Sequence, residues 1–436
     1  MQSEAVPFKH PWKETNLGSV SVIEVGGTPS TAIPAFWSGG DIPWMSSGDV
    51  HQRRIVDVPG RITKLGFQSS NAKLIEPPAV AMALAGQGKT RGTVALTLLQ
   101  VCTNQSVALV KGQDGVLDTS FLFHALDARY EELRARSAGG GRAGLSKAII
   151  EAIPIPLPSL EEQQRITEIL DTVDETIALT SSLIAKLKQI RAGLLHDLLT
   201  RGLDEDGKLR DAITHPEQFK DSPLGRIPKD WRWDMARLLC NEIVVGVVCN
   251  ATNSYIGQGR QGIPFLRSQN IRPNYIDTNG LLYISSSFNA LQSKSILHSG
   301  DVIIVRTGYP GTASVVPEEL EGANCFSLIV ARPNYLILDP HFFAQYLNSE
   351  NCKTFINRAH FGSAQHNFNI REMDKLPILV PPLSEQVDIV NRINTYDTRI
   401  RTEEAYLDKL KLQKKGLMHD LLTGRVRVNT LQQVRA

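Results

Sequence analysis

The sequence predicts an α+β fold that is built twice. Two similar globular halves are each followed by one long α-helix, and the two helices pair as an antiparallel coiled coil with pseudo-twofold symmetry. First, GLLHDLLTRG from position 193 recurs almost unchanged as GLMHDLLTGR from position 416. Second, a heptad pattern of apolar residues, typical of paired long helices, leads into each copy. Third, the remaining halves mix short β-rich runs, turns and short helices.

The internal repeat extends far beyond the HDLLT segments. At an offset of 223, the difference between positions 193 and 416, IPI from position 153 matches LPI from position 376. At the same offset, EQ from position 162 matches EQ from position 385. In the N-terminal part of each copy the offset becomes 221, so that IPWMSSGDV from position 42 corresponds to IPFLRSQNI from position 263. The chain is therefore two copies of one unit, and a twofold axis between the copies would make their helices antiparallel.

The globular halves are expected from about Trp12 to Glu151 and from about Trp231 to Asp374. Runs such as TVALTLLQV and GDVIIVRTG alternate with glycine, asparagine and proline turns, and amphipathic stretches such as TSFLFHALDARYEELRAR follow as short helices. The expected boundaries are residues 1–157 and 229–380 for the globular domains, 158–202 and 381–425 for the long helices, 203–228 for a linker and 426–436 for a C-terminal tail.

Each long helix carries an apolar seam that advances in alternating steps of four and three. Polar residues interrupt it at Thr180 and Arg191 in the first copy, and at Glu403 and Lys414, the same places, in the second. Matched interruptions indicate that one helix meets the other. A helix over about residues 160–199 would be roughly 60 Å long at about 1.5 Å per residue. The residues expected to pair the helices are Ile166, Leu170, Val173, Ile177, Ile184 and Leu187 in the first, and Ile389, Ile393, Tyr396, Ile400, Leu407 and Leu410 in the second.

The helix ends carry recognisable signals. Ser159 and Glu162 fit the S-x-x-E capping box, whereas the second copy has Pro382 in place of the serine and must begin differently. Gly202 and Gly424 lie just past the expected C-terminal ends, where glycine commonly stops a helix.

Histidine occurs on the expected last turn of each long helix, as His196 and His419. A duplicated catalytic base is one interpretation, and a duplicated structural or partner-docking part is the other. A catalytic histidine needs convergent partners, and the sequence shows none for these two. We therefore expect a structural or docking role, with protonated histidine suited to the negative end of a helix.

Composition excludes several classes of protein. A formal net charge of +2 gives no strong overall basic field, although basic residues could gather on one face. The N-terminus lacks the pattern of a secretory signal, and no run of about 18 apolar residues could span a membrane. The cytoplasm is therefore the expected compartment. Without CxxC pairs or companion histidines, the cysteines are expected to be buried thiols and no metal site is expected; they are Cys102, Cys240, Cys249, Cys325 and Cys352.

Catalytic motifs are not supported either. AGQGKTRGT from position 85 suggests a phosphate-binding loop, but that motif requires glycine at position 83, which is Ala83. A β-turn with a solvated lysine is one alternative, and a glycine-rich turn that approaches nucleic-acid phosphates is another. The [NDS]-P-P-[YF] tetrad of amino-methyltransferases, HExxH and GxSxG are all absent. No catalytic residue and no cofactor are therefore expected.

The order of these motifs resembles the specificity subunits of type I restriction-modification systems, over nearly the whole chain. The resemblance rests on PSLEEQQRI from position 158, PPLSEQVDI from position 381, the paired GL[LM]HDLLT segments and FGSAQHNFN from position 361. The first copy departs from the last of these with GGGRAGLS from position 139, so Gln365, His366 and Asn367 have no clear counterpart there.

The resemblance implies a function. Each globular domain would be a target recognition domain that reads one half of a split, asymmetric sequence in double-stranded DNA. The helices would hold the domains apart, and their length would set the unread gap. Two DNA methyltransferase subunits would bind, one on each copy, and restriction subunits would join through the complex. S-adenosylmethionine and ATP would then belong to those partners and not to this chain.

Polar residues after matching strands are the candidates for DNA contact. In SSGDV from position 46 and RSQNI from position 267, arginine, glutamine and asparagine could pair with base edges, although an ordinary polar turn is an open alternative. The residues in these turns are Ser46, Ser47, Arg267, Ser268, Gln269 and Asn270. Candidates for contact with the DNA backbone are Lys89, Thr90, Arg91, Arg306 and Tyr309.

Two other functions stay open at this point. The chain could be the recognition subunit of a fused methyltransferase-nuclease system of the type IIB or IIG kind. It could also be a coiled-coil adaptor that binds only proteins, which would show no sequence-dependent DNA binding.

Overall fold

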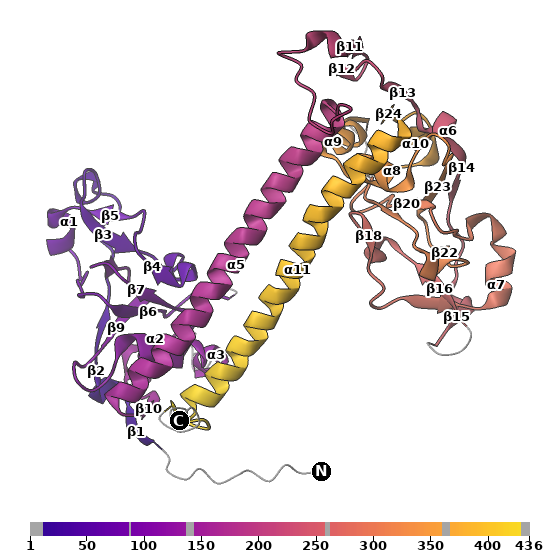
Figure 1. Ribbon diagram of the computed structural model, residues 1–436. Helices are drawn as coiled ribbons and strands as arrows, with labels where there is room; N and C mark the ends of the chain where they lie inside the picture. The colour runs from indigo at the N-terminus through magenta and orange to yellow at the C-terminus, as the bar shows by residue number, and fades with distance from the viewer. Residues whose placement is uncertain (1–11, 87–88, 137–143, 258–261, 360–366, 429–436) are drawn as a thin grey trace, which may run out of the picture. The chain divides into compact units, whose positions relative to one another are not determined.

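The structure is a computed structural model that describes residues 12–86, 89–136, 144–257, 262–359 and 367–428 (Figure 1). Its contacts divide the chain into two compact units. Unit 1 combines Met1–Ser182 with Ala405–Ala436, and unit 2 is Leu183–Glu404. Each unit therefore contains one globular half, the beginning of the long helix that follows it, and the end of the other long helix.

Unit 1 is built on a five-stranded sheet in the order β2-β9-β6-β7-β4 (Figure 1). The strands pair antiparallel, except that β4 runs parallel to β7. A three-stranded sheet, β5-β3-β8, and the pair β1-β10 complete the unit. The strands are β1 (Lys13–Asn16), β2 (Ser21–Val25), β3 (Ile42–Met45), β4 (Arg54–Ile55), β5 (Arg61–Ile62), β6 (Ala79–Ala83), β7 (Val94–Thr97), β8 (Cys102–Thr103), β9 (Val107–Gly112) and β10 (Pro154–Leu157).

Unit 2 repeats this topology. Its main sheet, β14-β23-β20-β21, has the same order as β2-β9-β6-β7, and β16 pairs parallel with β22 as β3 pairs with β8. The two-stranded sheet β13-β24 likewise corresponds to β1-β10. The strands are β11 (Phe219–Ser222), β12 (Gly225–Pro228), β13 (Arg232–Met235), β14 (Cys240–Val245), β15 (Tyr255–Ile256), β16 (Ile263–Leu266), β17 (Ile271–Arg272), β18 (Tyr275–Ile276), β19 (Leu282–Ile284), β20 (Val302–Ile304), β21 (Ala313–Val315), β22 (Asn324–Cys325), β23 (Ile329–Pro333) and β24 (Pro377–Val380).

Short helices cover the sheets and complete the predicted α+β architecture. In unit 1, Asp118 caps α2 by accepting a hydrogen bond from the backbone N–H of Phe121 at 2.7 Å. In unit 2, Asp339 caps α8 through Phe342 at 2.8 Å. Both phenylalanines are fully buried. The short helices are α1 (Lys64–Gln68), α2 (Thr119–Asp127), α3 (Tyr130–Arg136), α4 (Lys147–Glu151), α6 (Ala236–Leu239), α7 (Ser286–Leu291), α8 (Pro340–Leu347), α9 (Glu350–Ala359) and α10 (Ile370–Asp374).

The two predicted long helices are present as α5 (Leu160–Thr200) and α11 (Leu383–Leu422). In unit 1, Ile166 and Leu170 of α5 share a core with Leu421 and Leu422 of α11. In unit 2, Ile389 and Ile393 of α11 share a core with three leucines near the end of α5, Leu195, Leu198 and Leu199. All the residues predicted to form the seam are buried or half-buried.

The helix segments run antiparallel within each unit. In unit 1, Glu162 at the start of α5 binds Arg427 beyond the end of α11, and Asp174, further along α5, binds Lys414, earlier in α11. Unit 2 shows the same antiparallel arrangement, since Glu385 at the start of α11 binds Arg210, which lies beyond the end of α5.

The ends of the long helices differ in part from expectation. Ser159 Oγ accepts a hydrogen bond from the backbone N–H of Glu162 at 3.3 Å, which is one half of the predicted capping box. The other half is missing, because the Glu162 carboxylate instead binds Arg427 and Trp12. Gly202 and Gly424 have positive φ angles of 65° and 71°, the left-handed conformation that glycine adopts at a helix end.

Candidate nucleic-acid interface

The first polar turn follows β3. Ser46 donates to Asp49 Oδ2 from its backbone N–H at 2.8 Å and from its hydroxyl at 3.1 Å. This closes a short 3₁₀ turn, η3 (Asp49–Gln52), and the chain leaves it through Arg53, whose φ is 61°. Ser46 and Ser47 are both half-buried. The turn is thus held by its own aspartate, with the two predicted serines at its start.

The second polar turn follows β16 and has the same construction. The backbone N–H of Arg267 donates to Asn270 Oδ1 at 3.0 Å, at the offset of 221 that relates the two turns. The turn ends at Asn270 and leads into the short β17–β18 hairpin, in which Asn274 has a φ of 65°. Gln269 is exposed, Ser268 is half-buried, and Arg267 Nε is buried with no hydrogen-bond partner within the described part of the chain.

Asn270 takes a structural place that the sequence did not reveal. Its side chain is only 1 % exposed, and its amide also donates to the backbone carbonyl of Asp277 at 3.0 Å. Both polar atoms of its side chain are therefore used within the domain, whereas Asp49 in the first unit accepts both bonds from Ser46 on Oδ2. We assign Asn270 to the support of the turn, which leaves Arg267, Ser268 and Gln269 as candidates for base contact.

The glycine-rich turns connect antiparallel strands, β6 to β7 in unit 1 and β20 to β21 in unit 2. A phosphate-binding loop instead leads from a strand into a helix, so this geometry agrees with the absence of a nucleotide cradle. Lys89 is exposed and Thr90 Oγ1 lies 3.1 Å from His51 Nε2, which joins this turn to the first polar turn. Arg91 is half-buried, and Gln87 and Gly88 lie outside the described residues.

In the second glycine-rich turn the two predicted residues differ in availability. Arg306 donates to the backbone carbonyl of Phe368 and to Ser327 Oγ, both at 3.3 Å, so its guanidinium is partly engaged within the domain. Tyr309 is 82 % exposed at the tip of the turn, between Gly308 and Gly311, whose φ angles are 86° and 81°. Tyr309 and Lys89 are thus the most accessible of the backbone-contact candidates.

The repeated glutamates near the helix starts anchor each globular domain. Glu385 is 8 % exposed, accepts from Trp231 Nε1 at 3.0 Å and pairs with Arg210 at 2.7 Å. Glu162 forms the equivalent contacts with Trp12 and Arg427 in unit 1, at 3.2 Å and 2.7 Å. The repeated glutamines beside them, Gln163 and Gln386, accept from the backbone N–H of Asp118 and Asp339. Sequence reasoning missed both arginines, because they occupy segments that do not match between the copies.

The repeated HDLLT segments have one buried and one exposed side. Leu198 and Leu421 are buried in the cores of unit 2 and unit 1 respectively. His196 and His419 are exposed, and their backbone carbonyls accept from Thr200 Oγ1 and Thr423 Oγ1. The leucines thus repeat because each helix end packs into a domain core, whereas the histidines repeat on the surface.

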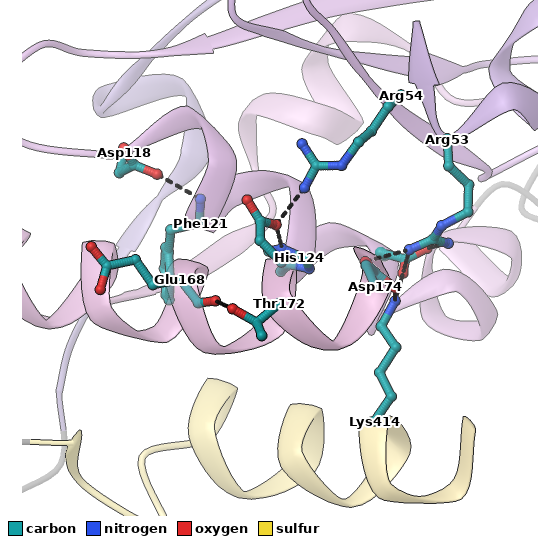
Figure 2. Close-up of polar contacts among 11 residues, drawn as sticks. Arg53, Arg54, Asp118, Phe121, His124, Glu168, Thr172, Asp174 and Lys414 are labelled. Carbon is teal, nitrogen blue, oxygen red and sulfur yellow. Dashed lines mark hydrogen bonds and ion pairs between the residues drawn. The ribbon is translucent and has the colours of Figure 1, made fainter. Parts of the chain in front are cut away.

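A polar network joins the first polar turn to the long helices in unit 1. Figure 2 shows Arg53 and Lys414 approaching Asp174 from opposite sides, at 3.4 Å and 2.5 Å. Beside them, buried His124 lies 2.6 Å from Asp171, which also pairs with Arg54. Burial raises the pKa of Asp171, but the hydrogen bond to His124 and the charge of Arg54 outweigh it, so this pKa is lowered.

The model of the family described as the type I restriction modification DNA specificity domain matches residues 9–189 and 257–412, most of the chain. The chain belongs to the type I restriction-modification DNA specificity family.

Similarity to individual members of the specificity family is moderate in sequence and extends along most of the chain. The chain is 24 % identical over 353 residues to the type I restriction enzyme MjaVIII specificity subunit from Methanocaldococcus jannaschii, a match that covers 80 % of this chain and 79 % of that protein. It is 25 % identical over 337 residues to the EcoBI specificity subunit from Escherichia coli, which covers 76 % and 66 %.

Two solved structures share the fold of this specificity-family chain. A type I restriction-modification system S subunit from M. genitalium matches with a TM-score of 0.60 and 16 % identity, over 96 % of this chain and 98 % of that one. A structure described as the basis of complex assembly and conformational transition of the type I R-M system matches with a TM-score of 0.55 and 18 % identity, over 97 % and 100 %.

The thiols of this specificity-family chain mostly follow expectation. Cys102, Cys240, Cys325 and Cys352 are buried, and burial raises the pKa of each thiol to about 12. Cys249 is exposed, so the prediction of a buried thiol was wrong there. It lies in a loop between β14 and β15, whereas three of the buried cysteines lie in strands and Cys352 lies in α9.

Two kinds of feature are absent from the described residues. These residues contain no group of histidine, cysteine and acidic side chains that could hold a metal ion. Within the same ranges, no helix is both long enough and apolar enough to cross a membrane.

Proposed function

We propose that this chain is the DNA sequence-specificity subunit of a type I restriction-modification complex. It reads a bipartite, asymmetric target in double-stranded DNA with two target recognition domains, residues 1–157 and 229–380. It also serves as the scaffold for two DNA methyltransferase subunits and, through the complex, for restriction subunits. Membership of the specificity family supports this role, and such a subunit would act in the cytoplasm, where DNA is accessible to it.

One observation carries the proposal of an asymmetric target. The main sheets of the two units share the order of four strands, and each unit has a polar turn after β3 or β16 in which a backbone N–H donates to a side chain three residues on. At matching positions, however, Ser46 in unit 1 corresponds to Arg267 in unit 2, and Gly48 corresponds to Gln269. Serine, arginine and glutamine offer different hydrogen-bond patterns to base edges. Like frames with unlike side chains should present two different half-sites to one duplex.

The long helices are proposed to separate the two domains. Residues 158–202 and 381–425 would pair as an antiparallel coiled coil with pseudo-twofold symmetry, joined by the linker 203–228 and followed by the tail 426–436. The antiparallel contacts found separately in unit 1 and in unit 2 support this pairing, as do the matched ion pairs of Lys414 and Arg191. Helix length would then set the number of unread base pairs, at about 5.4 Å per helical turn against roughly 3.4 Å per base pair.

Duplicated surfaces support the binding of two equivalent partners. His196 and His419 recur at exposed positions. Packing into the domain cores explains why the neighbouring leucines recur, but it does not explain why the histidines do. A methyltransferase subunit on each copy would account for the repeated exposed residues. S-adenosylmethionine and ATP would bind the partner subunits, and this chain would act without a catalytic residue of its own.

Methylation mapping tests the proposal. The chain is expressed with its methyltransferase partner in a host that lacks adenine methylation, and modified adenines are mapped across the genome. We expect one split motif with two unlike halves. DNA binding by the complex should also be sequence-dependent and should weaken with added salt. A complex that binds DNA without sequence preference would instead support a protein-only adaptor, and a nuclease activity in the partner chain would support a fused system.

A further inference from the structure

Arg53 closes the first polar turn in a conformation that suits arginine poorly. Its φ is 61° and its ψ is −48°, a combination that residues with a Cβ rarely adopt. The guanidinium binds Asp127 through two hydrogen bonds, at 3.2 and 3.0 Å, and reaches Asp174 at 3.4 Å. It also lies 5.5 Å from the centre of the Phe123 ring. These side-chain contacts hold a backbone that arginine by itself would leave.

Asn274 holds the equivalent position in unit 2, at the offset of 221, with a φ of 65°. Its amide accepts from Asn348 Nδ2 at 2.8 Å and donates to Gln345 Oε1 at 3.0 Å. Gln345 in turn donates to Asp397 at 3.3 Å and accepts from Arg191 at 2.8 Å. Neutral hydrogen bonds thus hold Asn274 itself, and Gln345 links it to the charged Asp397 and Arg191 of the long helices. Asparagine tolerates a positive φ better than most residues.

The same offset makes Asn348 the counterpart of Asp127, so the two junctions match position by position. In unit 1 the connection consists of charged groups, since Arg53 pairs with Asp127 and with Asp174. Asp174 also pairs with Lys414, and Figure 2 shows Arg53 and Lys414 on either side of it. This network borders two hollows open to solvent, of about 660 and 520 Å³. Because water and ions reach it, its ion pairs should weaken as salt is added.

We propose that Arg53 is a positioning residue for DNA recognition in unit 1, which holds the 46–53 turn in place through ion pairs with Asp127 and Asp174. Asn274 holds the 267–274 turn by neutral hydrogen bonds. When the ion pairs of Arg53 are lost, its backbone relaxes from the disfavoured conformation with positive φ and the turn shifts. Recognition of the first half-site is therefore sensitive to salt, and recognition of the second is not. This inference rests on the proposed function.

The test uses the intact complex with the methyltransferase partner and a DNA library randomised at each half-site. The variants are Arg53→Asn, Asp127→Asn and the double variant, which installs the asparagine pair of unit 2. Arg165→Gln is the charge control, since Arg165 pairs with Glu161 on the surface of α5. Preference at each half-site is measured as the methylation rate of matched over mismatched sites, at low and high salt, with thermal unfolding recorded alongside.

We expect the Arg53→Asn and Asp127→Asn variants to lower preference at the first half-site about fivefold, with the second half-site unchanged. The double variant should recover most of that preference and lose its sensitivity to salt. Unchanged first half-site preference in a folded Arg53→Asn complex would overturn the inference, and so would an equal loss at both half-sites. If the wild-type complex shows no split target at all, the proposed function fails instead.

Discussion

Arg191 Nε lies 2.7 Å from Asp397 Oδ1 in unit 2, and Lys414 Nζ lies 2.5 Å from Asp174 Oδ1 in unit 1. Both pairs join α5 to α11, and the offset of 223 relates the two cations as well as the two aspartates. The seam interruptions at Arg191 and Lys414 thus form one interhelical ion pair that occurs twice. A charged pair at a seam position specifies how helices align, because any shift in register would leave a charge unpaired.

Removing one member of this pair should destabilise the protein. Lys414→Ala leaves the Asp174 carboxylate, which is 16 % exposed, without its closest cation, and we expect a loss of about 2 kcal/mol. Lys411→Ala is the matched control on the same helix, since its pair with Asp408 is largely exposed and should contribute under about 1 kcal/mol. Denaturant unfolding measures both variants. Equal effects of the two substitutions would contradict a structural role for the seam ion pair.

Glycines within the long helices and glycines just past their ends should respond differently to substitution. In Gly193→Ala and Gly416→Ala the added methyl group meets open space in a helix interior, so each should stabilise by roughly 0.5–1 kcal/mol. Gly424→Ala should destabilise by about 1–2 kcal/mol because of its positive φ. Gly202→Ala should cost more than that, because its Cβ would lie 2.4 Å from Glu385 Oε1.

Thermal and denaturant unfolding of these four variants checks the predicted ranking of their stabilities. Stabilisation by Gly202→Ala would be incompatible with the close contact between the helix end and the Glu385 anchor.

The acid side of the stability profile should depend on Asp171. Its folded-state pKa lies below the ordinary value of 3.8, so its contribution to stability is present above that value and is lost as pH falls through the folded pKa. Asp171→Asn should therefore be less stable than the wild type at neutral pH, and the difference should shrink below about pH 4. Unfolding free energies between neutral and acidic pH measure this. The exposed Asp114→Asn serves as control, and a constant difference for Asp171→Asn at all pH values would contradict the assignment.

Three polar side chains should affect DNA binding in different ways. Lys89→Ala should weaken binding to all sequences and lower the salt slope by about one unit, because it removes one backbone contact. Gln269→Ala should relax preference at the second half-site, where a good base contact contributes about 1–3 kcal/mol. Asn270→Ala should instead reduce stability, since it opens the turn. Salt titrations and half-site selection distinguish these outcomes, and a purely base-specific effect of Asn270→Ala would contradict its structural assignment.

The repeat and the long helices were predictable because they follow period and spacing. A seam in steps of four and three, together with an offset of 223, indicated both the helices and their matched interruptions. The predicted α+β class also held, since β-branched runs between turns were recognised as strands. Strand order could not be predicted in this way, because β9 pairs with β2 and β6 through contacts far apart in the sequence.

The candidate nucleic-acid interface was harder to predict from the sequence than the fold. Asn270 has an amide side chain of the kind that contacts bases, yet it is buried. Only its spacing from Arg267 indicated that it could close a turn. Arg210 and Arg427 anchor the repeated glutamates from segments without a common offset. The equivalence of Arg53 and Asn274 was hidden because a charged and a neutral residue share only the offset of 221 and a positive φ.

The most direct test of the central claim is a domain exchange. Residues 231–374 are replaced by those of a family member with a different target, and methylated adenines are mapped for the wild-type and exchanged complexes. If two unlike domains read DNA at a spacing set by the paired helices, one half of the motif changes while the other half and the gap length stay the same. An unchanged motif, or a motif altered in both halves, would contradict the account.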